Sequence, residues 1–315
     1  MNYRNKLGDK MIANRKICVL GLGSMGMGVA LSLLQRQFEV IGFDINDNAM
    51  KNLESAGGVA KSSIRAAVEG CSAVIVLVVN DKQVEEVLFG KEGAVEGLSS
   101  GAVVVQSSTV PAAYAKTCGE RLLKQGFEMI DAPVSGGAAG ARSGNLSIMA
   151  SGPDSAFEQV ADMMEAISGK IHRLGTEHGI GSTVKTVNQL LAGVHIAAAA
   201  EAMAFGVRAG ANARELYDVI SGSAGSSWMW QNRVPHILDE DYTPLSAVDI
   251  FVKDLGIVLG TGHGLRFPLP LTAAAHQQFL AAASSGFGRE DDSAVFKVFQ
   301  KLSDIKIKEH EQANG

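Results

Sequence analysis

Short apolar runs alternate with helical patterns along the first half of the chain. The run at 73–79 is rich in β-branched residues on both faces, which is typical of a central parallel strand that is buried on both sides. From this pattern we expect strands at 16–20, 38–43, 57–60, 73–79, 102–105, 127–130, 146–150 and 171–174. We expect helices between them at 24–36, 47–55, 62–69, 82–89, 111–124 and 154–168. The alternation predicts an α/β fold with a doubly wound, mostly parallel sheet.

The pattern changes beyond residue 175, where the strand-like runs stop. The segment 176–210 is rich in alanine and has few β-branched residues after Val194, so we expect one long helix that begins near 179–182. Gly and Ser breaks separate further helical segments, at 214–221, 228–238, 250–260, 271–284 and 293–307. We therefore predict two domains, an α/β domain at 15–177 and an all-α domain at 178–315, joined by the long helix.

The first apolar run ends at a glycine-rich loop. It has the G-x-G-x-x-G spacing between a strand and a helix, and it reads Gly21-Leu22-Gly23-Ser24-Met25-Gly26. In this motif Gly21 permits the tight turn, Gly23 lets the backbone approach a pyrophosphate, and Gly26 lets the helix pack on the strand. The helix N-terminus adds free N–H groups and a partial positive charge. All six residues are therefore predicted to bind a dinucleotide.

The second apolar run ends at Asp44, where this class of fold places the acid that binds the adenosine ribose. A carboxylate there hydrogen-bonds both ribose hydroxyls and repels a 2′-phosphate, so it favours NAD over NADP. The alternative is an α/β turn that needs glycine for packing alone. An acid at the end of the next strand favours the cofactor site over that alternative.

Several further strands end in small or polar residues. Because the carboxyl ends of parallel strands meet at one edge, where such sheets bind ligands, we expect these residues to surround one crevice. They are the loop 21–26, Asp44, Val79, Asn80, Thr109 and the run Ser135-Gly136-Gly137. The run at 135–137 can present several backbone N–H groups to an anion such as a carboxylate. A flexible glycine loop without a ligand is the alternative.

The long helix carries two candidate catalytic residues near its start. Lys185 and Asn188 are three residues apart and therefore share a face of the helix. A lysine accepts a proton from an alcohol only when it is neutral, so its pKa must fall from about 10.4, as desolvation and a neighbouring cation both achieve. Asn188 can donate to, or accept from, the same hydroxyl. For Lys185 the alternative is a solvated lysine at a helix end. Lys253-Asp254, later in the chain, is either a pair that approaches the cleft or a surface charge pair.

Composition narrows the classes of function. The chain has 315 residues, of which 46% are hydrophobic and 19% charged, with a net charge of -5. No basic stripe is visible, which argues against a nucleic-acid partner. Cys18, Cys71 and Cys118 are far apart, so we expect no disulfide framework, no metal site and a reducing cytoplasm. The apolar stretch 190–209 contains charged residues, and we expect a buried helix there, not a membrane span.

Four blocks of sequence carry a resemblance to a known family. They are 21–26 (GLGSMG), 131–137 (DAPVSGG), 179–189 (GIGSTVKTVNQ) and 253–255 (KDL), with a weaker fifth at 292–294 (DSA). Over about residues 16–305 the chain resembles the β-hydroxyacid dehydrogenases, the 3-hydroxyisobutyrate dehydrogenase family. The resemblance implies NAD-dependent oxidation of a small hydroxy acid, an N-terminal Rossmann domain, and a helical C-terminal domain that forms homodimers or homotetramers. One departure is Gln189, which stands where many members have a second Asn.

The resemblance also implies roles for individual residues. Lys185 corresponds to the family's catalytic lysine, which acts as general base, and Asn188 corresponds to its contact with the substrate hydroxyl. The run at 135–137 corresponds to the loop that holds the substrate carboxylate. Thr109 and Lys253 match family positions near the nicotinamide end of the cofactor. Under this hypothesis the hydroxy acid enters between the two domains.

Two later segments narrow the expected substrate. The sequences at 226–233 (SSWMWQNR) and 248–255 (VDIFVKDL) resemble family members that oxidise L-threonate, a four-carbon sugar acid, at C2 to 2-oxotetronate. The alternatives are oxidation of 3-hydroxyisobutyrate, reduction of tartronate semialdehyde, and a scaffold that binds the cofactor without catalysis. Trp228, Trp230 and Asn232 either pack in the core or an interface, or line the substrate pocket.

Overall fold

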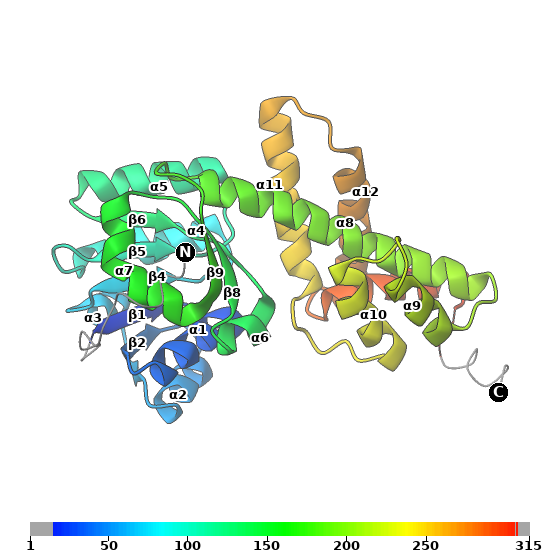
Figure 1. Ribbon diagram of the computed structural model, residues 1–315, viewed down its shortest axis with the longest axis horizontal. Helices are drawn as coiled ribbons and strands as arrows, with labels where there is room; N and C mark the ends of the chain where they lie inside the picture. The colour runs from blue at the N-terminus through cyan, green and yellow to red at the C-terminus, as the bar shows by residue number, and fades with distance from the viewer. Residues whose placement is uncertain (1–14, 306, 308–315) are drawn as a thin grey trace. The chain divides into compact units, whose positions relative to one another are not determined.

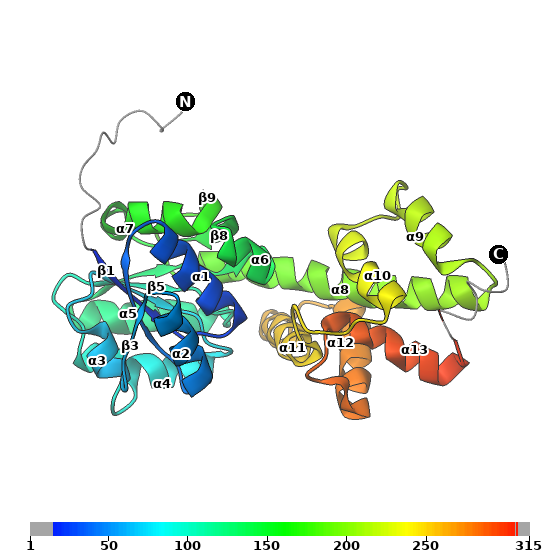
Figure 2. The same cartoon turned by 90° about the horizontal axis from the view of Figure 1, so that it is seen from below.

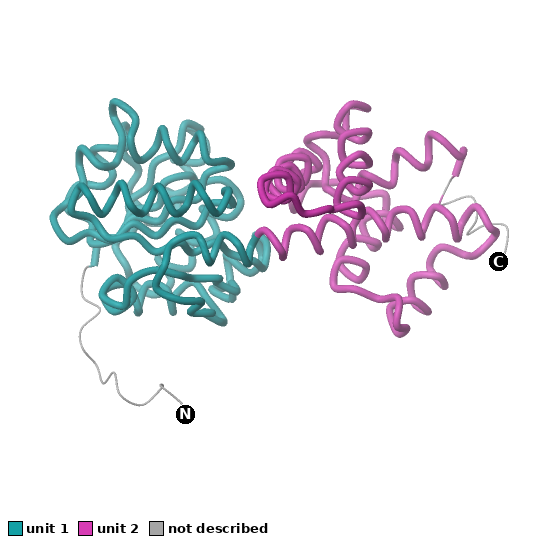
Figure 3. Tube along the Cα trace, turned by 90° about the horizontal axis from the view of Figure 1, so that it is seen from above, with its two compact units in different colours: residues 1–185 teal, residues 186–315 magenta. Residues whose placement is uncertain are grey.

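The computed structural model describes residues 15–305 and residue 307. The chain divides into two compact units, Met1–Lys185 (unit 1) and Thr186–Gly315 (unit 2), which Figure 3 shows in different colours. This division falls inside one long helix, α8. The domain boundary at 177 stays a prediction.

Unit 1 is built on a six-stranded parallel sheet with the order β3-β2-β1-β4-β5-β6. Its strands are β1 Lys16–Leu20, β2 Glu39–Phe43, β3 Val59–Ala60, β4 Ala73–Val76, β5 Val103–Gln106 and β6 Glu128–Asp131. Leu20 of β1 pairs with Phe43 on one side and Val76 on the other, so the loops after these three strands start side by side. The strand order reverses between β1 and β4, which is where sheets of this kind bind ligands.

Helices cover both faces of this sheet (Figures 1 and 2). The side chains of β1 alternate between two apolar clusters, because Ile17 and Val19 belong to one and Cys18 and Leu20 to the other. The first cluster includes side chains of α1 Ser24–Gln35, α2 Asp47–Ser55, α6 Gly137–Arg142 and α7 Asp154–Ile167. The second includes side chains of α3 Ile64–Val68, α4 Asp81–Phe89 and α5 Ala112–Lys124. Burial on both faces explains the unbroken apolar strands and confirms the predicted doubly wound α/β fold.

A second, smaller sheet follows β6 in the chain. Its order is β7-β8-β9, formed by β7 Val134–Ser135, β8 Leu146–Ala150 and β9 Ser168–Arg173. β7 pairs with β8 antiparallel, and β8 pairs with β9 parallel. The apolar runs at 146–150 and 171–174 are therefore strands, as expected, but they lie outside the six-stranded sheet.

Unit 2 is built from helices, as predicted. They are α8 Ile180–Arg208, which begins in unit 1, then α9 Ala213–Ser221, α10 Trp228–Asp239, α11 Val248–Leu265, α12 Pro270–Ala282 and α13 Phe296–Ser303. A π-helical turn at Ala283–Phe287 and a 3-10 turn at Asp292–Val295 lie between α12 and α13. One apolar cluster joins these elements, with Met203, Trp230, Phe251 and Phe279 among its buried members.

The long helix α8 is apolar over most of its length. By length and composition alone it can cross a membrane, since its most apolar window has a mean hydropathy of 1.7. Half of that window, 50%, is buried inside the structure, however, and the core helix of a soluble protein has the same properties. Ile196, Ala200 and Met203 of α8 belong to the core of unit 2.

Two local features differ from what the sequence led us to expect. The strand expected at 73–79 ends at Val76, because the apolar run continues into a loop in which Val78 N–H donates to the hydroxyl of Ser108 at 2.9 Å. The helix α6 was not expected, since its glycines disfavour an isolated helix. It forms against α1, where a Cβ on Gly28 would lie 2.7 Å from the Cβ of Ala141. In both places tertiary contacts outweigh the local pattern.

Candidate active site

The three glycines of the first loop serve different purposes. A Cβ at Gly26 would lie 1.9 Å from the carbonyl oxygen of Gly21, and a Cβ at Gly21 would lie 2.4 Å from that of Leu77. Gly21 also has a φ of +92°, which disfavours any other residue. At Gly23, in contrast, an added Cβ would meet nothing within 4 Å. The chain itself does not need glycine at position 23, which fits a backbone left bare for a ligand phosphate.

Asp44 is held against this loop by backbone donors. Its Oδ2 accepts from the N–H of Leu22 at 2.6 Å, and its Oδ1 accepts from the N–H of Asn46 at 2.8 Å. The side chain is half-buried. A carboxylate offers about four lone-pair sites, so acceptor sites remain for the two hydroxyls of a ribose. The acid and the glycine loop therefore lie together, and the residues present fit a dinucleotide.

The loop after β4 carries Val79 and Asn80. The Oδ1 of Asn80 caps α4 by accepting from the N–H of Gln83 at 2.9 Å, and the Oε1 of Gln83 accepts from the N–H of Val79 at 2.8 Å. The predicted cofactor residue Asn80 thus has a structural task of its own, because Ser, Thr, Asp and Asn stabilise helix N-termini in this way. Val79 is 47% exposed, unlike the buried residues of the strand before it.

The loop after β5 carries Thr109 and is tied to its neighbour. Gln106 Oε1 accepts from the N–H of Ser108 at 2.7 Å, and Ser108 Oγ in turn accepts from the N–H of Val78 at 2.9 Å. Gln106 and Ser108 are buried, so water does not compete for these bonds. The half-buried Thr109 therefore follows a rigid segment at the same sheet edge.

The run Ser135-Gly136-Gly137 is an ordered connection and not a loose loop. Ser135 ends β7, where it pairs with Ser147 of β8, and Gly137 begins α6. Gly136 and Gly137 have φ values of +129° and +64°, which only glycine adopts easily. Because α6 packs on α1 at Gly28, this candidate anion site is held against the helix that follows the dinucleotide loop.

Asp131, at the end of β6, anchors the start of the long helix. Its Oδ2 accepts from the N–H groups of Gly179 and Ser182 at 3.0 and 2.8 Å, and its Oδ1 accepts from the Ser182 hydroxyl at 2.7 Å. Ser151 accepts from the N–H of Gly181 at 3.0 Å. Burial raises the pKa of Asp131, while these hydrogen bonds oppose that change. This capping role of Asp131 was not predicted from the sequence, although the same signal, an aspartate at the end of a strand, was used at Asp44.

Lys185 lies one turn after this anchored helix start. Its residue is only 7% exposed, so it is not the solvated lysine of a helix end that the sequence left open. The capping bonds from Asp131 and Ser151 hold the backbone of the preceding turn. Lys185 is therefore a buried residue that directly follows a capped helix start.

In unit 2 the structure joins Asn188 to Lys253 through two other side chains. Asn188 Nδ2 donates to Gln189 Oε1 at 2.9 Å, and Gln189 Nε2 donates to Asp254 Oδ2 at 2.5 Å. The Nζ of Lys253 lies 2.7 Å from Asp254 Oδ1. The side chain of Asp254 is 2% exposed and that of Lys253 22%, so this is not a solvated surface pair. From the sequence, Lys253 and Asp254 were expected as a pair, but neither was connected to Asn188 or Gln189.

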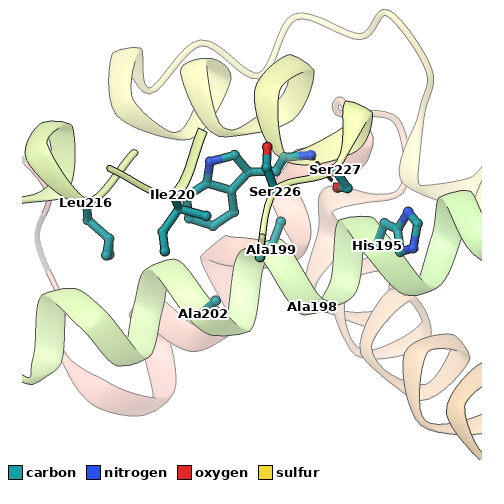
Figure 4. Close-up of a pocket in the computed structure, with 10 residues that line it drawn as sticks. His195, Ala198, Ala199, Ala202, Leu216, Ile220, Ser226 and Ser227 are labelled. Atoms are coloured by element: carbon teal, nitrogen blue, oxygen red, sulfur yellow. Dashed lines mark hydrogen bonds between the residues drawn. The ribbon is translucent and has the colours of Figure 1, made fainter. Parts of the chain in front are cut away.

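A cavity of about 380 Å³ lies within unit 2, between α8 and the segments that carry α9 and α10 (Figure 4). It is mostly apolar, and its lining includes His195, Ser226 and Trp230 but none of the predicted catalytic or cofactor residues. The Nε1 of Trp230 donates to the hydroxyl of Ser221 at 3.3 Å, and its ring belongs to the core, whereas Trp228 is 63% exposed. Trp230 therefore packs in the core of unit 2 and also lines this cavity, which His195 borders as well.

Metal and thiol chemistry find little support in the described part of the chain. Residues 15–305 and 307 contain no group of three or more His, Cys, Asp or Glu side chains arranged to hold a metal ion. The thiols of Cys18, Cys71 and Cys118 are free and buried. Burial raises the pKa of Cys118 to about 12, so that thiol is a poor nucleophile.

Two family models match the chain in succession. The model for the NAD binding domain of 6-phosphogluconate dehydrogenase matches residues 16–175. The model for the NAD-binding region of NADP-dependent 3-hydroxyisobutyrate dehydrogenase matches residues 179–299. Together they span both units.

Relatives and solved structures agree with these models. An L-threonate dehydrogenase of Cupriavidus necator is 56% identical over 91% of this chain and 96% of its own, and that of Escherichia coli K12 is 50% identical over 90% and 95%. Among solved structures, a 3-hydroxyisobutyrate dehydrogenase from Salmonella typhimurium is 46% identical, with a TM-score of 0.85 over 90% of this chain and 99% of its own.

Proposed function

The chain belongs to the 3-hydroxyisobutyrate dehydrogenase family of β-hydroxyacid dehydrogenases, and we propose that it oxidises L-threonate at C2 to 2-oxotetronate. As a member it is an NAD-dependent oxidoreductase that acts on CH–OH groups. The observation that carries the substrate is that five relatives named L-threonate dehydrogenase are 47 to 56% identical over at least 90% of this chain.

The residues proposed to hold NAD come from the edge of the six-stranded sheet. The loop 21–26 receives the pyrophosphate, where Gly23 leaves the backbone open, and Asp44 binds the adenosine ribose. Thr109 and Lys253 serve the nicotinamide end, and Val79 and Asn80 line the cofactor between. NAD⁺, when bound, supplies the acceptor for the hydride that leaves the substrate carbon.

The proposed substrate groups are held by three elements. The backbone N–H groups and hydroxyl of the run Ser135-Gly136-Gly137 bind the carboxylate. Lys185 in its neutral form takes the hydroxyl proton, and its resulting positive charge stabilises the carbonyl oxygen that develops. Asn188 orients the alcohol from the next turn of the same helix. The burial of Lys185 supports this role, because few waters compete for its amine.

The test is NADH formation at alkaline pH over a panel of hydroxy acids, with NAD⁺ compared with NADP⁺. The panel contains L-threonate, D-erythronate, D-glycerate and both 3-hydroxyisobutyrate enantiomers. We expect the highest kcat/KM for L-threonate with NAD⁺. Turnover of another panel member alone contradicts the substrate but keeps the mechanism, and NADH binding without any turnover favours a scaffold that has lost its chemistry.

Two other substrates are each favoured by a similar protein. The Salmonella typhimurium structure at 46% identity is titled a 3-hydroxyisobutyrate dehydrogenase, and a 2-hydroxy-3-oxopropionate reductase of Escherichia coli is 30% identical. Either activity needs the same carboxylate site, base and cofactor. These substrates therefore belong in the panel, the second as the aldehyde with NADH.

We further propose that the protein is a cytoplasmic homodimer or homotetramer that associates through unit 2. Apolar side chains are exposed along α8, with Val187 at 55%, Leu191 at 49% and Phe205 at 75%. Free buried cysteines accord with a reducing compartment. Leu191→Glu should lower the mass measured by light scattering, whereas Leu302→Glu, at a residue 77% exposed on α13, should not. An unchanged mass for Leu191→Glu contradicts this surface, and recovery of the protein outside the cytoplasmic fraction contradicts the location.

A further inference from the structure

We propose that Gln189 and Asp254 are positioning residues, which hold the amide of Asn188 and the ammonium of Lys253 at the two ends of one series of side chains, joined by two hydrogen bonds and one ion pair. The inference rests on the proposed function, in which Asn188 contacts the substrate hydroxyl and Lys253 the nicotinamide end of the cofactor. It goes beyond it by assigning a task to two residues that touch neither ligand. All four residues lie in unit 2, on α8 and α11.

The geometry is continuous from one end to the other. The Asn188 to Gln189 bond is 2.9 Å, the Gln189 to Asp254 bond is 2.5 Å, and the ion pair of Asp254 with Lys253 is 2.7 Å. The two oxygens of Asp254 are used separately, Oδ2 by Gln189 and Oδ1 by Lys253. One carboxylate thus serves both ends of the chain.

The carboxylate also decides which way each amide faces. The carboxylate oxygen of Asp254 accepts the hydrogen bond from Gln189, so Gln189 turns its NH₂ group toward Asp254. The carbonyl oxygen of Gln189 is then left for Asn188, which must turn its own NH₂ group toward Gln189. Asp254 therefore sets the orientation of the Asn188 amide through Gln189. The second N–H and the carbonyl of the Asn188 amide keep a fixed direction for the substrate alcohol.

The burial of Gln189 and Asp254 strengthens the hydrogen bond between them. Gln189 is 8% exposed and Asp254 2%. A hydrogen bond to a buried charge is stronger than one in water, and its loss leaves an unsatisfied group. Helices α8 and α11 approach closely here, since a Cβ on Gly193 would lie 2.7 Å from Leu255 Cδ2.

The identity of residue 189 matters for the same reason. Glutamine is one methylene longer than the asparagine that many family members have at this position. With the backbones held together by packing, that methylene lets the amide span from α8 to the carboxylate on α11. A side chain one methylene shorter at 189 would lengthen the distance from the amide nitrogen to Asp254 Oδ2, now 2.5 Å, by about 1.5 Å.

The experiment measures kcat and KM for L-threonate and the NADH dissociation constant in Gln189→Met and Asp254→Asn. The matched control is Gln278→Met, because Gln278 on α12 also donates to a carboxylate on α8, that of Glu201 at 3.0 Å, away from the chain described here. We expect Gln189→Met to lower kcat/KM about tenfold while NADH affinity stays within about twofold. Asp254→Asn should weaken both turnover and NADH binding, and Gln278→Met should change neither.

A double-mutant cycle separates positioning from a general structural effect. In an Asn188→Ala background, Gln189→Met should cause less than about a twofold further loss, because Gln189 acts through Asn188. A full tenfold loss in that background overturns the inference, as does a Gln189→Met enzyme equal to the Gln278→Met control. If Gln189→Met is poorly folded, Gln189→Asn keeps the amide and makes the same test with the same outcomes.

The two proposals fail in different ways. A wild-type enzyme without L-threonate turnover contradicts the proposed substrate, and the cycle is then run with the panel substrate that the wild type does oxidise. A wild-type enzyme that is active on L-threonate, with additive losses in the cycle, contradicts the role of Gln189 alone.

Discussion

The two units position their candidate site residues by different means. In unit 1 the donors are mostly backbone N–H groups, supplied by glycine-rich turns and by helix starts that carboxylates such as Asp44 and Asp131 hold in place. In unit 2 the positions are set by side chains that bond one another across two helices, as Gln189 and Asp254 do. The first arrangement depends on backbone geometry at turns and helix starts, and the second depends on the packing of two helices.

The two arrangements should respond differently to substitution. A glycine turn fails when a Cβ is added, because backbone atoms have nowhere to move. A series of hydrogen-bonded side chains loses its geometry when one polar partner is removed, because the next buried group is left without its hydrogen bond. The glycine turns of unit 1 should therefore be sensitive to side-chain size, whereas the bonded side chains of both units should be sensitive to the loss of a polar group.

Lys185, the last residue of unit 1, is expected to give the largest effect. Lys185→Ala should lower kcat by about 10²- to 10⁴-fold, because the general base is lost, while the NADH dissociation constant stays within about twofold. Stopped-flow turnover and NADH fluorescence titration check the two parts. Lys124→Ala, an exposed residue at the end of α5, is the control. A Lys185→Ala enzyme near the wild-type rate would show that another group takes the proton.

The first glycine loop should separate folding from cofactor binding. Gly26→Ala should cost about 4 kcal/mol or more in unfolding free energy, because the new Cβ would lie 1.9 Å from the carbonyl oxygen of Gly21. Gly23→Ala should leave stability within about 0.5 kcal/mol yet raise the NADH dissociation constant at least tenfold, since only a ligand meets that position. Urea unfolding and NADH titration measure both variants. Equal losses of stability would contradict the distinction.

Asp131 tests whether the helix start in unit 1 depends on one carboxylate. Asp131→Ala should lower the unfolding free energy by about 3 kcal/mol, because the N–H groups of Gly179 and Ser182 and the Ser182 hydroxyl lose their acceptor. We expect kcat to fall as well, since Lys185 lies on the next turn. Asp131→Asn, which keeps one acceptor oxygen, should recover part of both losses. A stable but inactive Asp131→Ala enzyme would point to direct contact with the substrate instead.

A buried ion pair in unit 2 provides the pH-dependent counterpart. Arg233 donates to Asp292 from Nε at 2.5 Å and from Nη2 at 3.1 Å, and both residues are buried. Burial lowers the pKa of Arg233, but the carboxylates of Asp292 and Asp291 outweigh it, so that pKa lies above its usual range. Burial raises the pKa of Asp292 to about 6, although Arg233 acts in the opposite direction.

The sign of the resulting pH dependence follows from the raised pKa of Asp292. The folded protein keeps the proton on Asp292 to a higher pH than the unfolded chain, whose value is near 3.8, so stability from this group is lost as pH rises from about 4 to about 6. The loss should reach about 2–3 kcal/mol and be absent in Asp292→Asn. Urea unfolding at several pH values between 4 and 7 measures it. Parallel pH profiles for wild type and variant would contradict the prediction.

The sequence predicted most of the fold because its signals are local. The G-x-G-x-x-G loop, the strand predicted at 73–79, of which 73–76 form β4, and the helix after Pro111 are each recognisable from a few neighbouring residues. The helix α6 was missed because its sequence favours no helix on its own and depends on the contact of Ala141 with Gly28. Elements made stable by distant partners are those that a local pattern cannot predict.

The same division holds for the candidate site. By itself the sequence determined the α/β plan, the glycine loop with Asp44, and the pairing of Lys185 with Asn188 on one helix face, because backbone geometry and helical spacing follow directly from the order of residues. Only the tertiary structure decided that Asp131 caps the helix of Lys185 and that Gln189 reaches Asp254. Those contacts join residues 51 and 65 positions apart. The packing of whole elements brings them within hydrogen-bond distance, and no local pattern encodes it.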